Sequence, residues 1–282
     1  KGLFMSLKKN EIISLHIDSL SSDGNGVGRF DGQAVFVPFS APGDTADVRI
    51  VKVCKTYAFG IIHALHTPAP CRVSPPCPIF GRCGGCDLQH LDYAEELRAK
   101  TTFVADAMRR LGGIHHPVLP CLASPLPERY RNKVQYPLYA DETGAVHAGF
   151  YAARSHRVIA CDDCLLQPAL LNDITREACS VLTRLGVSVY DERTGHGFAR
   201  HLYLRHAVTT GKVLLCLVGN GRTFPGMEDF CRSLTQRFAE IDSIVLNINE
   251  KNTNVVLGPE CVILWGSGVL RDEMAGVPVA LN

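Results

Sequence analysis

Residues 23–44, DGNGVGRFDGQAVFVPFSAPGD, place turn-forming segments on both sides of a strand-forming run. The glycines of DGNGVGR (23–29) interrupt regular structure, and APGD (41–44) is a second turn signal. Between the two turns lies AVFVPF (34–39), which is almost wholly apolar. This succession predicts short strands that are joined by tight turns.

The segments on either side of this stretch show the alternation of half-buried strands. A further strand is expected at residues 57–65. Several short strands in one small segment predict a small barrel, because closure removes the unpaired edges of a sheet. We assign this barrel to residues 8–66. The alternating apolar residues are Ile13, Leu15 and Ile17 before the stretch, and Ala46, Val48 and Ile50 after it.

The glycines at 24–29, GNGVGR, also allow the interpretation of a phosphate-binding loop. Such a loop needs a following helix whose N-terminus faces the phosphate. The segment that follows here has the pattern of a strand, so we interpret these glycines as turn residues.

Two different segments follow the barrel. Residues 67–90 are rich in proline, cysteine and glycine, and no regular element fits them. Residues 92–111 predict a helix, since Asp92 suits the N-cap and Glu95 stands three residues on, as in a capping box. The Gly-Gly pair at 112–113 ends this helix.

From about residue 120 onward the pattern mixes strands and helices, which predicts a sheet with helices packed on it. The chain is therefore expected to be multidomain, with the barrel followed by an α/β (α+β) central domain. That domain comprises residues 67–90 and 120–264. The expected strands are 131–139, 146–151, 156–160, 202–209, 212–218 and 243–249, and the expected helices are 168–185 and 227–239.

Composition limits the classes of function. The net charge is +1, so any affinity for nucleic acid must come from local basic patches. No apolar run has the length of a membrane span, and the N-terminal residues lack a secretory signal, so we expect no membrane partner and a cytoplasmic location. Twelve cysteines in a reducing compartment indicate metal binding more than disulfide formation.

The segment CPIFGRCGGC (77–86) carries the strongest chemical signal. Cys77, Cys83 and Cys86 have the spacing C-x5-C-x2-C. A 4Fe–4S cluster or a structural zinc ion needs four ligands, so a fourth thiolate must come from elsewhere. Spacing alone leaves iron–sulfur and zinc open.

Candidates for the fourth ligand are Cys161 and Cys164, in ACDDCLLQ, with Cys71 as a competitor. The two CxxC pairs lie farther apart than the spacer of a typical zinc ribbon. The remaining cysteines are isolated, and we interpret them as small buried hydrophobes: Cys54, Cys121, Cys179, Cys216, Cys231 and Cys261.

A basic stretch at 129–157 offers the groups that RNA binding needs. Tyr130 can stack on a base, and Arg131 and Lys133 can contact phosphates. The alternative is an edge strand with solvated charges. Arg154 and His156 lie in the same stretch. In the barrel, Arg29 and Phe30 follow the first turn, where they suit RNA contact, although Phe30 fits a core position equally well.

Several motifs resemble bacterial 23S rRNA (uracil-5-)-methyltransferases, in the order in which that family carries them. The stretch at 23–44 looks like the family's N-terminal TRAM domain, an OB-type RNA-binding barrel. CGGCDLQHLDYAEELRAK (83–100) resembles the segment that begins at the cluster cysteines. The other motifs are YRNKVQYPL (130–138), GFYAARSH (149–156), CLLQ (164–167) and NTNVVLG (252–258).

This resemblance implies a 4Fe–4S cluster rather than zinc. It implies the ligands Cys77, Cys83, Cys86 and Cys164, and leaves Cys161 without a role. It also implies binding of 23S rRNA through Arg29, Phe30, Tyr130, Arg131, Lys133, Arg154 and His156, by a monomer. Residues 91–119 and 265–282 are expected to pack on a catalytic domain.

Family members carry that catalytic domain at the C-terminus, with an S-adenosylmethionine site, a nucleophilic cysteine and a glutamate base. The sequence ends at GVPVALN. We therefore expect the nucleophile and the base beyond residue 282, and residues 1–282 to be inactive alone. The expected function is the RNA-binding, cluster-bearing portion of an S-adenosylmethionine-dependent enzyme that makes 5-methyluridine in 23S rRNA. The alternative is a non-catalytic RNA-binding module stabilised by zinc or an iron–sulfur cluster.

Overall fold

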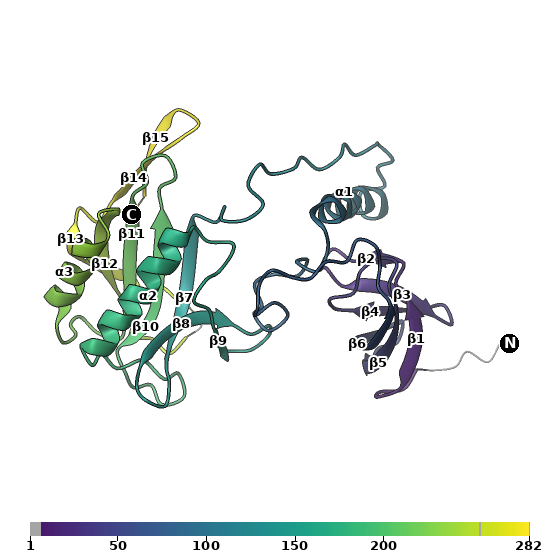
Figure 1. Cartoon of the computed structure of the whole chain (residues 1–282), viewed down its shortest axis with the longest axis horizontal. Coiled ribbons are helices and arrows are strands. Elements are labelled where there is room, and N and C mark those ends of the chain that lie inside the picture. The colour runs from purple at the N-terminus through teal and green to yellow at the C-terminus, as the bar shows by residue number, and fades with distance from the viewer. Residues whose placement is uncertain (1–6, 254, 282) are drawn as a thin grey trace. The chain divides into compact units, whose positions relative to one another are not determined.

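The computed structural model describes residues 7–253 and 255–281. The chain forms two compact units, residues 1–125 and 126–282 (Figure 1). This division places residues 67–90 with the barrel, whereas the sequence grouped them with the central domain. The domain bounds expected from the sequence stay a prediction.

The first unit contains a six-stranded sheet in the order β1-β5-β6-β4-β3-β2. Neighbouring strands are antiparallel except β4 and β6, which are parallel. Strands β1 and β3 also contact each other, so the sheet curls on itself. The strands are β1 (Ile12–His16), β2 (Ser19–Leu20), β3 (Gly26–Phe30), β4 (Gln33–Val37), β5 (Thr45–Val53) and β6 (Tyr57–Thr67).

The core of this sheet consists of the residues that alternate in the sequence. Ile13 and Leu15 on β1 are buried, and the residues between them are exposed. Residues of β4, β5 and β6 complete the core. Because side chains of a strand point alternately to opposite faces, the period of two in the sequence becomes one apolar face inside a curled sheet.

Two irregular segments flank the helix α1 (Tyr93–Arg110). The expected cap is confirmed, since Asp92 Oδ1 accepts a hydrogen bond of 2.7 Å from the Glu95 backbone N–H. In the helix only Ala99 is buried, and the side chain of Val104 is 50% exposed. Most of the surface of α1 is therefore not buried by the rest of the described chain.

The second unit contains a seven-stranded mixed sheet in the order β13-β12-β11-β10-β7-β8-β9, in which only β11 and β12 are parallel. A separate hairpin joins β14 and β15. The elements are β7 (Lys133–Ala140), β8 (Val146–Tyr151), β9 (Val158–Ala160), α2 (Ala169–Arg184), β10 (Ala199–His206), β11 (Val213–Gly219), α3 (Met227–Arg237), β12 (Ile241–Ile248), β13 (Glu260–Gly266), β14 (Leu270–Met274) and β15 (Val277–Leu281).

Strand β11 explains how this sheet is covered. Its residues Val213, Leu215 and Leu217 belong to the large core beneath α2 and α3 (Figure 1). The residues between them belong to a second core, which also contains Leu270 and Leu281 of the hairpin. Both faces of β11 are thus buried, which accounts for its continuous apolar sequence.

The expectation of an α/β arrangement with helices packed on a sheet is confirmed. The two expected helices form, one residue shorter at each end for α2 and two residues shorter at the C-terminus for α3. Strands β13, β14 and β15 were missed. Strand β13 has no buried residue, so its sequence carries no clean hydrophobic alternation.

Asp44 of the APGD turn connects the sheet to the chain that follows it. Its carboxylate is fully buried and accepts hydrogen bonds from the backbone N–H groups of Ala41 (2.7 Å) and Ala69 (2.9 Å). The Arg72 guanidinium donates two more, one of them at 3.1 Å. Burial alone would raise the pKa of Asp44, but these donors and the Arg72 charge lower it below its ordinary value.

Replacing Asp44 should therefore destabilise the first unit. We expect Asp44→Ala to lower the free energy of unfolding by about 3 kcal/mol, because it removes the carboxylate partner of Arg72 and leaves two buried N–H groups without their acceptor. Stability of the native chain should fall as the pH drops from about 4 through the lowered folded pKa, since the unfolded state binds the proton more readily. Urea unfolding at several pH values measures both effects.

The matched control is Asp23→Ala, which removes an exposed carboxylate of the same unit. It should leave the stability and its pH dependence unchanged. An Asp44→Ala chain as stable as the native one would contradict the role assigned to this carboxylate.

Candidate nucleic-acid interface and cysteine loop

The cysteine loop, residues 77–86, packs against the sheet of the first unit. The ring of Phe80 lies 5.2 Å from that of Phe39 and 5.7 Å from that of His90, measured between centroids. His90 is buried and its Nε2 lies 3.2 Å from the carbonyl oxygen of Ser40. Aromatic packing and this contact hold the loop to the end of β4, without any regular structure inside it.

The glycine turn at 23–29 also lies close to the segment that directly follows the cysteine loop. Gly24 has a φ of +76°, and a Cβ placed there would lie 3.0 Å from the Cβ of Asp87. A larger residue would be strained in this backbone conformation and would press on the segment after the cysteines. The interpretation as turn glycines rather than a phosphate loop is therefore supported by the packing.

The three thiols of the loop are half-buried. Gln89 Nε2 donates to the Sγ of Cys86 at 3.4 Å. Within residues 7–253 and 255–281, however, no three or more His, Cys, Asp or Glu side chains are gathered so that they could hold a metal ion. The expected cluster is thus not shown by the arrangement of these side chains.

The polar groups around the cysteines nevertheless suit a bound metal ion or iron–sulfur cluster. Gln89 Oε1 and His90 Nδ1, beside the loop, are buried without a hydrogen-bond partner in the described part of the chain. In the second unit the same holds for both amide atoms of Gln167, three residues after Cys164. Because buried polar atoms are normally hydrogen-bonded, these orphans indicate partners that protein atoms do not supply. Thiolates with nearby amide donors suit iron–sulfur or zinc.

The two cysteines of ACDDCLLQ differ in their surroundings. Cys161 is buried and Cys164 half-buried. The pKa of Cys164 is lowered to about 6, first by a hydrogen bond from the Cys161 thiol and, against the effect of burial, by the backbone N–H groups of Leu166 and Gln167. Of this pair, Cys164 is the thiol whose surroundings favour the thiolate, with Cys161 as the neighbouring donor.

Arg129 joins the CLLQ turn to the start of the basic strand. Its guanidinium makes a two-pronged ion pair with Asp163, at 2.6 and 2.9 Å, and donates at 3.1 Å to the carbonyl oxygen of Cys164. The backbone N–H groups of Arg129 and Arg131 bond to the carbonyls of Leu165 and 166. Arg129 adopts a left-handed φ of +58°, which costs energy in a residue with a Cβ. The four hydrogen bonds of its guanidinium, which include one of 3.1 Å to the Gln167 carbonyl, offset that cost.

Asn172 at the start of α2 completes this connection. Its Nδ2 donates to Asp163 Oδ1 at 2.7 Å and to the Cys164 carbonyl at 3.2 Å. Its Oδ1 accepts from the hydroxyl of the fully buried Tyr136 at 3.0 Å and from the Cys164 backbone N–H at 3.3 Å. The sequence did not predict this network. No local pattern marks it, because its members are far apart in the chain.

The expected RNA-binding residues lie in three places. Tyr130 and Lys133 are exposed and Arg131 is half-buried at the start of β7. Arg154 and His156 are exposed on the turn between β8 and β9, and His156 Nδ1 lies 2.8 Å from Glu192 Oε2. In the first unit Arg29 is exposed, and its guanidinium donates to the Gly32 carbonyl at 3.1 Å. Phe30 packs against the core of that sheet.

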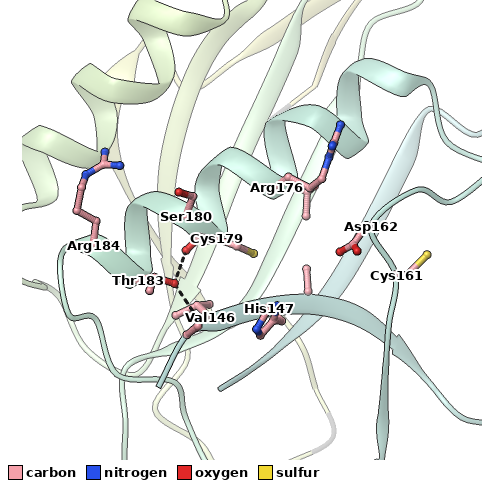
Figure 2. Close-up of a pocket in the computed structure, with 12 residues that line it drawn as sticks. Val146, His147, Cys161, Asp162, Arg176, Cys179, Ser180, Thr183 and Arg184 are labelled. Carbon is pink, nitrogen blue, oxygen red and sulfur yellow. Dashed lines mark hydrogen bonds between the residues drawn. The ribbon is translucent and has the colours of Figure 1, made fainter. Parts of the chain in front are cut away.

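A pocket of about 490 Å³ lies between α2 and β8 (Figure 2). Thr183 links α2 to β8 at this pocket. Its hydroxyl accepts a hydrogen bond of 2.8 Å from the Val146 N–H and donates one of 2.9 Å to the Cys179 carbonyl. Figure 2 shows the guanidinium groups of Arg176 and Arg184 extending away from β8. Burial and Asp162 raise the pKa of Cys179 to about 12, so its thiol is no nucleophile.

Comparison with known proteins identifies the first sheet. Residues 7–62 match the TRAM domain family. The expected N-terminal TRAM domain is thus confirmed. None of the described helices is long and apolar enough to cross a membrane.

Nearly the whole chain is similar to proteins described as uncharacterized RNA methyltransferases. One from Clostridium tetani is 38% identical over 276 residues, and one from Synechocystis is 36% identical over 276 residues. Each match covers 98% of this chain and 60% of the relative. The chain therefore spans about three fifths of the length of the curated relatives that it matches.

The fold is similar to that of a solved structure, the Pyrococcus abyssi tRNA (uracil-54, C5)-methyltransferase in complex with S-adenosyl-L-homocysteine. The TM-score is 0.67 at 23% identity, and the match covers 95% of this chain and 59% of that chain. At this identity the similarity concerns the fold.

These similarities correct the functional expectation from the sequence. A cluster-bearing portion without a catalytic domain was expected, with a non-catalytic metal-stabilised module as the alternative. Both descriptions are wrong, because similarity to RNA methyltransferases runs through 98% of the chain and is not confined to the barrel and the cysteine loop. The expected inactivity of residues 1–282 has no support. That the nucleophile and base lie beyond residue 282 stays a prediction.

Asn172 provides a test of the network at the CLLQ turn. Asn172→Ala should lower the free energy of unfolding by about 2 kcal/mol, because it leaves the buried hydroxyl of Tyr136 and the backbone groups of Cys164 with unmade hydrogen bonds. The measurement is chemical unfolding of the full chain. Asn132→Ala, at an exposed position next to the same network, is the control and should change stability by less than about 0.5 kcal/mol. Equal stability of the two variants would count against the network.

Proposed function

We propose that this chain functions in the transfer of a methyl group to carbon 5 of uridine in RNA, with 23S rRNA as the substrate. The observation that carries the proposal is similarity to RNA methyltransferases at 38% identity over 98% of the chain. The fold neighbour methylates carbon 5 of a tRNA uracil, as its description states. The choice of 23S rRNA rests on the ordered motifs at 23–44, 83–100 and 130–138. The expected monomeric state stays a prediction.

RNA binding is proposed for the TRAM domain and for the basic residues at the start of β7. Lys133 is exposed, and the structure records no ion pair for Arg131 or Lys133 among the described residues. Cations without a carboxylate partner are available to phosphates, and the exposed ring of Tyr130 is available to a base. Arg29, Arg154 and His156 are proposed as further contacts. Phe30 is kept as a contact through its partly exposed edge.

S-adenosylmethionine is the proposed methyl donor, because the fold neighbour was solved with S-adenosyl-L-homocysteine. At the end of β11, a Cβ on Gly219 would lie 2.5 Å from the ring of Phe198, so that ring already fills the space beside this glycine. We assign none of the described residues to the cofactor.

A 4Fe–4S cluster is proposed on Cys77, Cys83 and Cys86, with Cys164 as the fourth ligand. The support comes from the thiol spacing, the family resemblance, the donation of Gln89 Nε2 to the Cys86 sulfur, and the orphaned amide donor Nε2 of Gln167. A bound cluster would supply a rigid, thiolate-linked anchor for a loop that has no regular structure. Methyl transfer itself requires no redox step from it.

Metal analysis of the full chain, purified without oxygen, tests the cluster. We expect iron and acid-labile sulfide in equal amounts, and we expect Cys164→Ser to lose them. Cys161→Ser is the matched control and should retain them, since that thiol serves as a hydrogen-bond donor. Stoichiometric zinc without iron would contradict the cluster, and loss of iron only in Cys161→Ser would reverse the choice of ligand.

Disruption of the gene tests the activity of the whole protein. Mass spectrometry of 23S rRNA should then show the loss of 5-methyluridine at one or more positions, with restoration by a plasmid copy. Unchanged tRNA is the internal control. Loss confined to tRNA would contradict the rRNA substrate, and unchanged 5-methyluridine in both RNAs would contradict the methyltransferase.

A further inference from the structure

The second sheet has a face that its helices do not cover. Leu138 and Leu202 point into the core beneath α2, so Tyr139 and His201, the next residues along the same strands, point to the opposite face. The hairpin β14–β15 covers that opposite face at β11 and β12. Over β7, β8 and β10 the face instead borders a pocket.

This pocket has a volume of about 690 Å³ and is lined by aromatic rings and arginines. Its volume lies within the usual range for small-ligand sites. The lining comes from β7, β8, β10, the start of β9 with the turn before it, and the segment 189–193. The aromatic side chains are Tyr139, Tyr151, His156, Tyr190 and His201, and the arginines are Arg157, Arg193 and Arg200.

The rings are held by contacts among themselves. The rings of Tyr151 and His156 lie 5.4 Å apart at 37°. The Arg200 guanidinium lies 4.2 Å above the ring of Tyr190, and it is fixed by hydrogen bonds of 2.7 and 2.8 Å to the carbonyls of Asn249 and Lys251. Arg200 is thus a buried, immobile cation, and the tyrosine beneath it is already oriented.

The charges of the pocket favour an anionic ligand. Its two carboxylates already have partners, because Asp191 pairs with Arg193 and Glu192 lies 2.8 Å from His156. For the side chain of Arg157 the structure gives no carboxylate partner among the described residues. Burial, and then Arg200, lower the pKa of His201 to about 4, so its ring is neutral near pH 7 and adds a polar edge rather than a charge.

We propose that this pocket binds one unpaired nucleobase of the RNA substrate, stacked on the rings of Tyr151 and His156, with the adjoining phosphate at Arg157. Aromatic side chains on an open sheet face are a recurrent way of binding single-stranded RNA. The hydroxyl of Tyr151 lies 3.4 Å from His201 Nε2, and this contact holds the ring on which the base would stack. The inference rests on the proposed RNA substrate and names where one of its bases binds.

The pocket between α2 and β8 does not share these properties. Of its two arginines, Arg176 pairs with Asp173 and Arg184 contacts Ser233. Apart from His147, its lining consists of aliphatic, hydroxyl, thiol and charged side chains. A stacked base would find no cluster of rings there.

Binding of a single-stranded oligouridine of about 12 nucleotides to the full chain tests the proposal. His156→Ala should weaken binding about tenfold, because one stacking surface is lost. His156→Phe keeps a ring and should retain most of the affinity. The histidine is exposed, so neither variant removes a buried contact. Equal affinity of the native chain and His156→Ala would overturn the proposal.

Arg157→Gln tests the phosphate contact. It should reduce the slope of log affinity against log salt by about 0.7, which corresponds to one phosphate contact on a single strand. Arg232→Gln removes the same charge from α3, which packs on the other face of the sheet, and should leave the slope unchanged. Equal slopes for the two variants would overturn the phosphate assignment.

Photocrosslinking with 4-thiouridine in the oligonucleotide locates the base directly. We expect the crosslinked peptide to contain Tyr151 or Tyr190. Crosslinks confined to other peptides would overturn this inference alone, since RNA binding would persist. Absence of RNA binding by the native chain would instead contradict the proposed function. Equal binding of free uridine monophosphate would make the pocket a small-molecule site and overturn the assignment to RNA.

Discussion

The second unit is organised around the ion pair of Arg129 and Asp163. The pair holds the turn that carries Cys164 against the beginning of β7, and Asn172 extends the same hydrogen bonds to the first turn of α2. A strained backbone at Arg129 is tolerated because its guanidinium also satisfies two carbonyl groups of that turn. Asp163 is half-exposed, so its charge contributes little alone, and the geometry of the shared hydrogen bonds does most of the positioning.

The two faces of the second sheet differ in what covers them. One face is closed by α2 and α3 over a large apolar core, and the central strand β11 is buried on both sides. The strands β7 and β8 are buried on one side only, and their other side carries Tyr139 and Tyr151. This open sheet face presents aromatic rings and arginines to a ligand. Single-stranded RNA, the ligand proposed above, has bases for the rings and phosphates for the arginines.

In the first unit, too, an ion pair with shared hydrogen bonds joins segments that are distant in the sequence. The buried carboxylate of Asp44 joins the APGD turn to the chain after β6, and Arg72 links it to the segment that leads into the cysteine loop. The loop itself is held by aromatic packing at Phe80, next to the contact of His90 with Ser40. A loop of this kind gains most from an additional anchor, which is the role proposed for the cluster. In the proposed function, the cysteines would fix the shape of this loop.

The sequence by itself determined the elements whose signals are local. The alternation through Ile13 and Leu15, the cap at Asp92 and the apolar run of β11 depend on neighbours only a few positions away. The tertiary structure alone decided which residues that are far apart in the sequence come into contact. The Arg129 network and the pocket with Tyr151, Tyr190 and His201 join segments tens of residues apart, and only strand pairing and helix packing bring them together. Nothing local in the sequence singles out His201, because a histidine acquires its chemistry from what surrounds it, and its surroundings come from other strands.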